Sequence, residues 1–190
     1  RMSNEVQTDQ LTQIANRRGL LAAFATEQAK LERGSGEGAG EAAGLAKIAL
    51  ALLDIDNFKT VNDRFGHPAG DQVLITFVNS IRRNIRKSDF IARMGGDEFS
   101  ILFPETDQNS ARIVFSKIQG VLREEMQQKK WPVTFSVGII TCKTAPKTTD
   151  QLIQFADALM YAAKNDGRNT VKYSEYGGMD DLQKDEASQR

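Results

Sequence analysis

The chain has 190 residues, and its 25 acidic and 25 basic side chains give a formal net charge of zero, which argues against a protein that coats nucleic acid or an anionic membrane. Its single cysteine and single histidine exclude an intramolecular disulfide and any zinc site built from several cysteines or histidines. No apolar run is long enough to span a bilayer, and no signal peptide opens the chain. We therefore expect a cytoplasmic protein, or the cytoplasmic domain of a longer, membrane-bound one.

The spacing of apolar residues and turn residues predicts helices and strands along the whole chain. The first helix lies within 8–33 after an N-cap at Asn16, and the glycine-rich segment 34–44 is expected to be a flexible loop. The remaining elements are a strand at 47–55, a short and a long helix within 57–86 separated at Gly-His-Pro-Ala-Gly, strands at 90–93 and 98–103, a helix at 106–130, a strand at 131–142, a helix within 148–169 that stops near Asn165-Asp166-Gly167, and a strand at 170–173. This order indicates a mixed sheet covered by helices, an α+β or α/β sandwich.

The sequence RMGGDEFSILF, at 93–103, places two glycines before two adjacent acids and an apolar run. Glycine adopts the positive φ that tight hairpin turns require, so Gly95 and Gly96 predict a hairpin between the flanking strands. A strand that only fills a core does not need Asp97 and Glu98, because burying unpaired carboxylates is costly. The two acids therefore suggest a site at the edge of the sheet.

A second acidic pair, Asp54 and Asp56, ends the strand at 47–55. If that strand neighbours the hairpin, the four carboxylates converge at one edge of the sheet. Oxygen ligands of this kind suit Mg²⁺ or Mn²⁺ rather than zinc, and such ions promote phosphoryl or nucleotidyl transfer. Taken singly, an acid after a strand is better explained as a turn or N-cap residue, and Gly95-Gly96 as a plain turn. The combination favours a functional site without naming its substrate.

The residues also resemble the GGDEF domain of diguanylate cyclases, whose name motif stands unaltered at 95–99. The other blocks of the family follow in order: DQLTQIANRR (9–18), LLDIDNFKTVNDRFGHPAGDQVL (52–74), FSVGI (135–139) and DALMYAAKNDGRN (157–169). The resemblance covers residues 9–173, and it leaves 1–8 as a linker or expression remnant and 174–190 as a polar tail. It implies an α+β, palm-like nucleotide cyclase fold, with a central, mostly antiparallel five-stranded sheet flanked by helices.

The resemblance implies a bacterial signalling enzyme that condenses two GTP molecules into cyclic di-GMP and releases two pyrophosphates. The ribose 3′-hydroxyl of one GTP attacks the α-phosphate of the other. Because each domain holds one GTP, two domains have to meet as a homodimer. Mg²⁺ or Mn²⁺ is the implied cofactor, and no nucleic acid is expected as a partner.

The catalytic and metal-binding roles of the family carry over position by position. Asp54, the backbone carbonyl of Ile55 and Asp97 are expected to bind the metal. Asp97 is also the family's candidate for accepting the hydroxyl proton, with Glu98 beside it. Lys59 is expected to face the phosphates and stabilise charge in the transition state, although without the motif it reads as a solvated lysine on a helix.

Substrate recognition is assigned in the same way. Asn62 and Asp71 are expected to read guanine, whose N1–H and N2–H₂ edge adenine does not present, so that ATP is rejected. His67 lies between them and either lines the nucleotide pocket or serves as a turn residue. Lys164 and Arg168 are spaced by one helical turn and are expected to contact the phosphates from a shared face. The alternative is a basic helix end that complements the helix dipole.

The sequence RKSD, at 86–89, matches the family's RxxD motif ahead of GGDEF. In the family this arginine and aspartate bind cyclic di-GMP away from the active site, so Arg86 and Asp89 predict product inhibition. An arginine can fork onto phosphate or guanine, and an aspartate can accept from the guanine edge. The alternative is an exposed ion pair, which is common and contributes little.

Three classes of function remain open. They are an active diguanylate cyclase, a non-catalytic GGDEF module that binds GTP or cyclic di-GMP as a signalling receptor, and another palm-fold nucleotidyl transferase or cyclase. All the expected active-site residues are present, which argues against the non-catalytic module. Asn62 and Asp71 argue against an ATP-specific enzyme, and the diguanylate cyclase is therefore the preferred interpretation.

Overall fold

The computed structural model describes residues 7–34, 47–142, 146 and 148–177. The segment expected to be a glycine-rich loop thus lies outside the described residues apart from Gly34, as do most of the expected linker and tail. Among the helices that are described, none is both long and apolar enough to cross a membrane.

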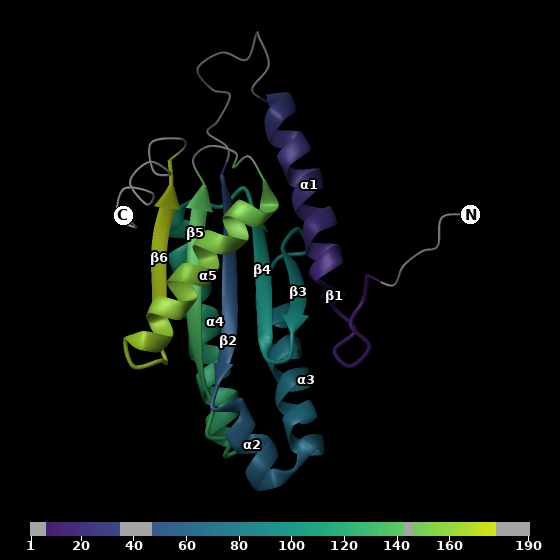
Figure 1. Ribbon diagram of the computed structural model, residues 1–190, viewed down its shortest axis with the longest axis vertical. Helices are drawn as coiled ribbons and strands as arrows, with labels where there is room; N and C mark the ends of the chain where they lie inside the picture. The colour runs from purple at the N-terminus through teal and green to yellow at the C-terminus, as the bar shows by residue number, and fades with distance from the viewer. Residues whose placement is uncertain (1–6, 35–46, 143–145, 147, 178–190) are drawn as a thin grey trace, which may run out of the picture.

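A mixed sheet of six strands, in the order β1-β3-β4-β2-β5-β6, forms the middle of the domain (Figure 1). Its strands are β1 (Ala15–Asn16), β2 (Ile48–Asp56), β3 (Phe90–Gly95), β4 (Glu98–Pro104), β5 (Thr134–Cys142) and β6 (Val171–Tyr176). The three inner pairings, β3–β4, β4–β2 and β2–β5, are antiparallel, whereas the two outer pairings, β1–β3 and β5–β6, are parallel. The expected α+β fold with a mostly antiparallel sheet is confirmed.

The expected count of five strands is wrong by one. The additional strand, β1, has only two residues and pairs with Ala92 and Arg93 of β3. A segment this short carries no alternation of apolar and polar residues, so periodicity cannot reveal it. At the other end of the chain, β6 runs on to Tyr176, beyond the strand expected at 170–173.

In the described part of the chain, five helices flank the sheet: α1 (Arg17–Gly34), α2 (Phe58–Phe65), α3 (His67–Asn84), α4 (Gln108–Gln128) and α5 (Thr149–Asn165). Asn16 caps α1 as predicted, because its side-chain oxygen accepts a hydrogen bond from the amide of Gly19 at 3.2 Å. The five-residue break expected between α2 and α3 is wrong. Only Gly66, at φ 87°, separates the two helices, and Pro68 is tolerated because the first turn of a helix needs no backbone donor there.

β2 is buried along its whole length because helices cover both faces of the sheet. Side chains alternate between the faces of a strand, so Ala51 and Leu53 pack with α3 and α4, whereas Leu50 and Leu52 pack with α1 and α5 (Figure 1). Asp54 and Asp56 continue the second row. The acids at the end of β2 therefore point toward the side of the sheet that α5 covers.

α5 lies very close to β5 at Gly138. A Cβ atom added at this glycine would collide with the backbone oxygen of Ala156 and the backbone nitrogen of Met160. Only glycine allows the backbone of the helix to approach the strand this closely. The contact fixes the depth at which α5, and Lys164 near its end, lie over the sheet.

Candidate active site

The two acidic pairs lie on neighbouring strands, which is the condition for their carboxylates to converge at one edge of the sheet. Asp54 of β2 stands directly opposite Glu98 of β4 in the antiparallel register. The amide of Ile55 donates a hydrogen bond to the carbonyl oxygen of Asp97 at 3.2 Å. Backbone bonds therefore fasten the GGDEF acids to the end of β2.

The turn that precedes these acids requires glycine. Gly96 has a φ of 52° and Gly95 a φ of 151°, and the β3–β4 register shifts between Arg93 and Gly95. No atom lies within 4 Å of a Cβ added at either glycine. The backbone of this turn thus has a conformation that residues other than glycine disfavour. It is also surrounded by open space, in which a bulky ligand can approach the backbone closely.

Arg93 holds the turn from β3. Its Nε and Nη2 atoms donate to the carbonyl oxygen of Gly96 at 2.9 and 2.7 Å, and its Nη1 atom donates to the carboxylate of Asp9 at 3.1 and 3.2 Å. Burial favours a higher pKa for Asp9, but hydrogen bonds from Thr12 and the charge of Arg93 outweigh it and lower the pKa. Sequence analysis missed the pair because its members are 84 residues apart and no local pattern joins them.

Asp54 is buried and forms an ion pair with Lys164, which reaches it from α5. Burial lowers the pKa of Lys164, and the nearby charge of Arg168 lowers it further. The amide of Arg168 donates to the carbonyl oxygen of Ala163 at 3.1 Å, which brings the two cations close together. The shared helical face expected for them is nevertheless wrong, because α5 ends at Asn165 and Arg168 lies in the turn that follows, at φ 65°.

Asp56, the second acid of β2, is 3% exposed. Its Oδ1 atom accepts from the hydroxyl of Ser136 at 2.8 Å, and its Oδ2 atom accepts from the hydroxyl of Thr134 at 2.8 Å and the amide of Asn169 at 3.1 Å. The carboxylate thus joins β2 to β5 and to the turn after α5. Sequence analysis gave this acid no role of its own. The available signal is the spacing of Thr134 and Ser136, which places both hydroxyls on one face of β5.

The two GGDEF acids bind protons more strongly than free carboxyl groups do. Burial is the main cause that raises the pKa of Asp97, and the charge of Asp56 acts in the same direction against that of Arg93. Burial also raises the pKa of Glu98, with further contributions from the charges of Asp157 and Asp97. A carboxylate in such surroundings suits a proton acceptor, and a cation placed among these acids would relieve their repulsion.

The donor atoms at this edge fit a divalent cation. Asp54 and Asp97 offer carboxylate oxygens and Ile55 offers a backbone carbonyl, which are the hard ligands that Mg²⁺ prefers. Over the described ranges, no three aspartate, glutamate, histidine or cysteine side chains are grouped as a metal site. Two carboxylates and one carbonyl suffice for Mg²⁺, because this ion usually completes its coordination with water and substrate phosphate oxygens.

The residues expected to read guanine lie on the helical pair α2 and α3. A Cβ added at Gly70 would fall on the side-chain oxygen of Asn62, so this amide rests against the first turns of α3. Asp71 follows Gly70 and is exposed, as is His67 at the first position of α3. The structure therefore brings Asn62 beside the part of α3 that carries Asp71, and it places His67 at a helix start rather than in a longer turn.

Lys59 lies in the first turn of α2 with its side chain 87% exposed, and it pairs with Asp63 at 2.8 Å. A hydrogen bond from Lys59 to this carboxylate, and its charge, raise the pKa of Lys59. These are the features of a solvated helical lysine. The structure does not place this side chain against the acids of β2.

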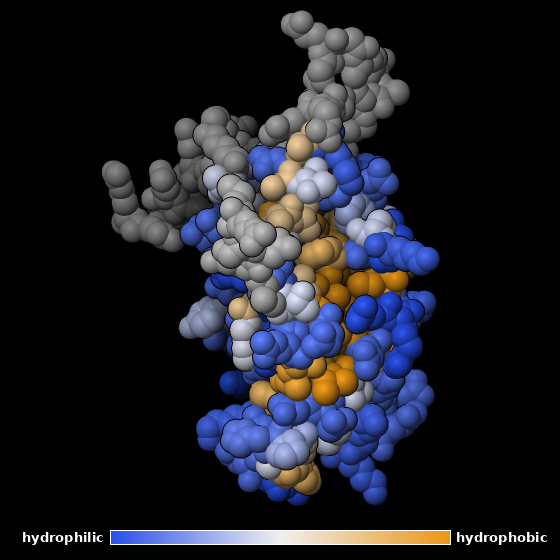
Figure 2. All heavy atoms as spheres, turned by 90° about the vertical axis from the view of Figure 1, so that its right-hand side faces the viewer, coloured by the Kyte–Doolittle hydropathy of each residue, from blue (hydrophilic) through white to orange (hydrophobic). Residues whose placement is uncertain are grey.

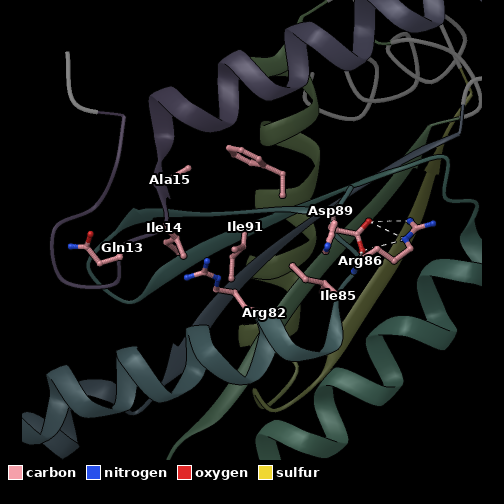
Figure 3. Close-up of a pocket in the computed structure, with 10 residues that line it drawn as sticks. Gln13, Ile14, Ala15, Arg82, Ile85, Arg86, Asp89 and Ile91 are labelled. Atoms are coloured by element: carbon pink, nitrogen blue, oxygen red, sulfur yellow. Dashed lines mark hydrogen bonds and ion pairs between the residues drawn. The ribbon is translucent and has the colours of Figure 1, made fainter. Parts of the chain in front are cut away.

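Arg86 and Asp89 border a pocket of about 410 Å³ that lies between the end of α3, β3 and residues 13–15 (Figure 3). Asp89 accepts from the amide of Arg86 at 2.8 Å and from its Nε and Nη2 atoms at 3.2 and 3.0 Å. The Nη2 atom also donates to the carbonyl of Pro104 at 3.1 Å and the hydroxyl of Thr106 at 2.8 Å. The side chain of Asp89 is 1% exposed, so the alternative of a plainly exposed ion pair is wrong for the aspartate.

The pocket is separate from the acidic edge. Pro104, which Arg86 contacts, pairs with Ile48 at the start of β2, whereas Asp54 stands near the other end of this strand, about 20 Å away along an extended chain. The side of the molecule that carries α1 and β3 shows a band of apolar surface between hydrophilic margins (Figure 2). Apolar side chains from the same segments, including Ile14, Phe90 and Ile91, line the pocket.

Comparison with known sequences agrees with this geometry. Residues 6–170 match the family model described as diguanylate cyclase, GGDEF domain. The diguanylate cyclase DgcP of Pseudomonas aeruginosa is 33% identical over 87% of this chain and 23% of its own length. The probable diguanylate cyclase DgcT of Escherichia coli is 32% identical over 88% of this chain and 36% of its own length. The chain therefore spans only about a quarter to a third of these two relatives.

Solved structures show the same fold. The coiled coil and GGDEF domain of DgcB from Caulobacter crescentus, determined in complex with c-di-GMP, has a TM-score of 0.73 and 30% identity, covering 88% of this chain and 85% of that one. The diguanylate cyclase SiaD of Pseudomonas aeruginosa, in complex with its activator SiaC, has a TM-score of 0.72 and 31% identity, covering 88% of this chain and 61% of that one. On the match over residues 6–170 and on this fold, the chain belongs to the family of diguanylate cyclase GGDEF domains.

Proposed function

We propose that this chain is a catalytic domain that condenses two GTP molecules into cyclic di-GMP and releases two pyrophosphates. The observation that carries this proposal is the meeting of the unaltered GGDEF acids with buried Asp54, to which Lys164 reaches from α5. Carboxylates for a cation and lysine for phosphate are together the requirements of nucleotidyl transfer.

Each half of the reaction forms one phosphoester bond. The 3′-oxygen of one GTP bonds to the α-phosphorus of the other, the bond from that phosphorus to pyrophosphate breaks, and the hydroxyl proton passes to Asp97. The raised pKa of Asp97 makes it a better proton acceptor than a free carboxylate. Bound Mg²⁺ or Mn²⁺ would be held by Asp54, Asp97 and the carbonyl of Ile55, and it supplies neutralisation of phosphate charge.

The other site residues bind and orient the nucleotide. Lys164 and Arg168 hold the phosphates, and Lys59 joins them when its long exposed side chain leaves Asp63. Asn62 and Asp71 pair with guanine, and His67 lines the nucleotide-binding site beside them. Glu98 assists the metal-binding acids.

Catalysis requires a homodimer, because each domain holds one GTP and the cyclic product contains two phosphoester bonds, one formed in each direction between the two nucleotides. The specific activity is therefore expected to rise with protein concentration. Cyclic di-GMP is expected to inhibit by binding in the pocket of Arg86 and Asp89, where the arginine fork and the aspartate suit phosphate and guanine.

The test is to incubate the protein with GTP and Mg²⁺ and to search for cyclic di-GMP by mass, with Asp97→Ala as the control. Product that disappears in the variant supports the proposal. Absence of product at high protein concentration, after bound cyclic di-GMP has been removed, overturns it and favours a binding module instead.

A further inference from the structure

Asp56 is a nearly buried carboxylate to which the proposed reaction gives no task. Its two oxygens accept three hydrogen bonds, from Ser136 and Thr134 of β5 and from the amide of Asn169. Both carboxylate oxygens of Asp56 are therefore occupied by hydrogen bonds within the protein. The contact to Asn169 is different in kind, because it ends on the backbone of a turn that belongs to another part of the site.

That turn has an unfavourable backbone conformation. Gly167, Arg168 and Asn169 have consecutive positive φ values of 98°, 65° and 47°, a region that residues with a Cβ rarely occupy. Such a conformation persists only when the surroundings hold it in place. The backbone contributes two of the bonds that do so, from Arg168 N to Ala163 O at 3.1 Å and from Val137 N to Thr170 O at 3.0 Å.

The third bond runs from the amide of Asn169 to the carboxylate of Asp56. Its acceptor lies on β2, the strand that also carries Asp54. We propose that Asp56 is a positioning residue, which anchors the amide of Asn169 and thereby holds Arg168 beside Lys164 for binding of the substrate phosphates. The inference rests on the proposed role of this edge as a GTP site. It adds a link from the strand of the metal-binding acids to the phosphate-binding turn.

The electrostatics support the same arrangement. The amide of Arg168 donates to the carbonyl oxygen of Ala163, the neighbour of Lys164, at 3.1 Å, and two like charges this close repel each other before a ligand arrives. Charge repulsion of this kind favours outward movement of Arg168, which lies beyond the end of α5 and is not held by its helical hydrogen bonds. A fixed amide next to Arg168 opposes that movement, and a carboxylate is a strong acceptor for it.

The first measurement follows the anchor itself. Amide hydrogen exchange is compared at Asn169 in the wild-type protein, in Asp56→Ala and in Asp56→Val, which keeps a side chain of similar size without an acceptor if the alanine variant folds poorly. Thr134→Val is the matched control, because it removes one hydroxyl from the same carboxylate and leaves the Asn169 contact. Faster exchange at Asn169 in the Asp56 variants, but not in Thr134→Val, is the expected result. An amide that stays protected in the Asp56 variants overturns the anchor.

The second measurement separates positioning from a purely structural role. Asp56→Ala is expected to weaken GTP binding by about tenfold, because one charge-assisted contact to phosphate is lost. Thr134→Val is expected to weaken GTP binding by less than about twofold. Inhibition by guanosine, which has no phosphate, is expected to be unchanged. In an Arg168→Ala background the Asp56 substitution is expected to add nothing further, because it acts through Arg168.

An undiminished effect in the Arg168→Ala background, or an equal loss of guanosine binding, overturns the inference. The apparent affinity for Mg²⁺ is measured alongside, and a change in it without a change in GTP affinity also counts against it. Failure of the cyclase proposal gives a different result: the wild-type protein binds GTP, and the Asp56 effect is measurable, but no cyclic di-GMP is formed.

Discussion

Two cation–carboxylate pairs of this domain differ in how they are held. Arg86 and Asp89 are three residues apart, and backbone and side-chain hydrogen bonds fix them locally. Lys164 and Asp54 come from α5 and β2, and they meet only because the helix packs closely over the sheet. The local pair is held by its own chain segment, whereas the long-range pair depends on packing, so that a cation or phosphate competing for either partner would open it.

The largest effect is expected from Asp97→Asn, at the edge of the sheet where the long-range pair lies. Removing the proton acceptor should lower cyclic di-GMP synthesis by about 10²- to 10⁴-fold, while binding of added cyclic di-GMP at the Arg86 pocket is kept. Synthesis is measured by mass and binding by calorimetry. Glu124→Gln, at an exposed acid of α4 outside both sites, is the control, and near-normal synthesis by Asp97→Asn would rule out the proposed acceptor.

Gly138→Ala tests the dependence of the catalytic pair on helix packing. The added methyl collides with the backbone of α5, so we expect a loss of about 1–3 kcal/mol in the free energy of unfolding together with a loss of synthesis. Gly120→Ala is the matched control, because no atom lies within 4 Å of its Cβ and alanine stabilises a helix by about 0.5–1 kcal/mol. Urea unfolding measures both variants, and equal stability of the two would contradict the packing argument.

Arg86→Ala removes the cation of the local pair. It leaves the buried carboxylate of Asp89 with the amide of residue 86 as its remaining donor, so the free energy of unfolding should fall by about 1–3 kcal/mol. Product inhibition should disappear while the initial rate stays unchanged. Lys59→Ala is expected to do the reverse, because this side chain is exposed: the rate falls and the thermal midpoint stays. Unaltered cyclic di-GMP binding by Arg86→Ala would remove the inhibitory role of the pocket.

The smallest effect concerns pH and Glu98. Burial raises the pKa of this acid, so its ionised form opposes folding. That contribution favours the folded state below the unfolded pKa of about 4.3 and is lost as the pH rises through the folded value. Glu98→Gln should therefore stabilise the protein at pH 7 by less than about 1 kcal/mol and have no such effect at pH 3. Urea titrations at the two pH values measure this, and a destabilised variant at pH 7 would contradict the sign.

The sequence predicts what depends on local pattern. The glycine hairpin at Gly95–Gly96, the acids at the strand ends and the cap at Asn16 follow from turn, strand and helix chemistry over a few residues. The two-residue strand β1 is too short for any pattern. The expectation of a shared face for Lys164 and Arg168 assumes that the helix continues, although the stop predicted near Asn165-Asp166-Gly167 lies between the two residues and is confirmed by the end of α5 at Asn165. The bonds of Asp56 and Arg93 join distant segments, which no local pattern specifies.

The sequence separation of these contacts has a consequence for folding. The partners of Asp56 lie 78, 80 and 113 residues away, whereas Arg86 and Asp89 lie three apart. Closing long loops is entropically costly and slow compared with local contacts. The Arg86–Asp89 pair should therefore be able to form early in refolding, and the bonds of Asp56 last. Pulse-labelled refolding would reveal this order as protection of the Asp89 amide, which donates to the carbonyl of Arg86, before protection of the Asn169 amide, which donates to Asp56.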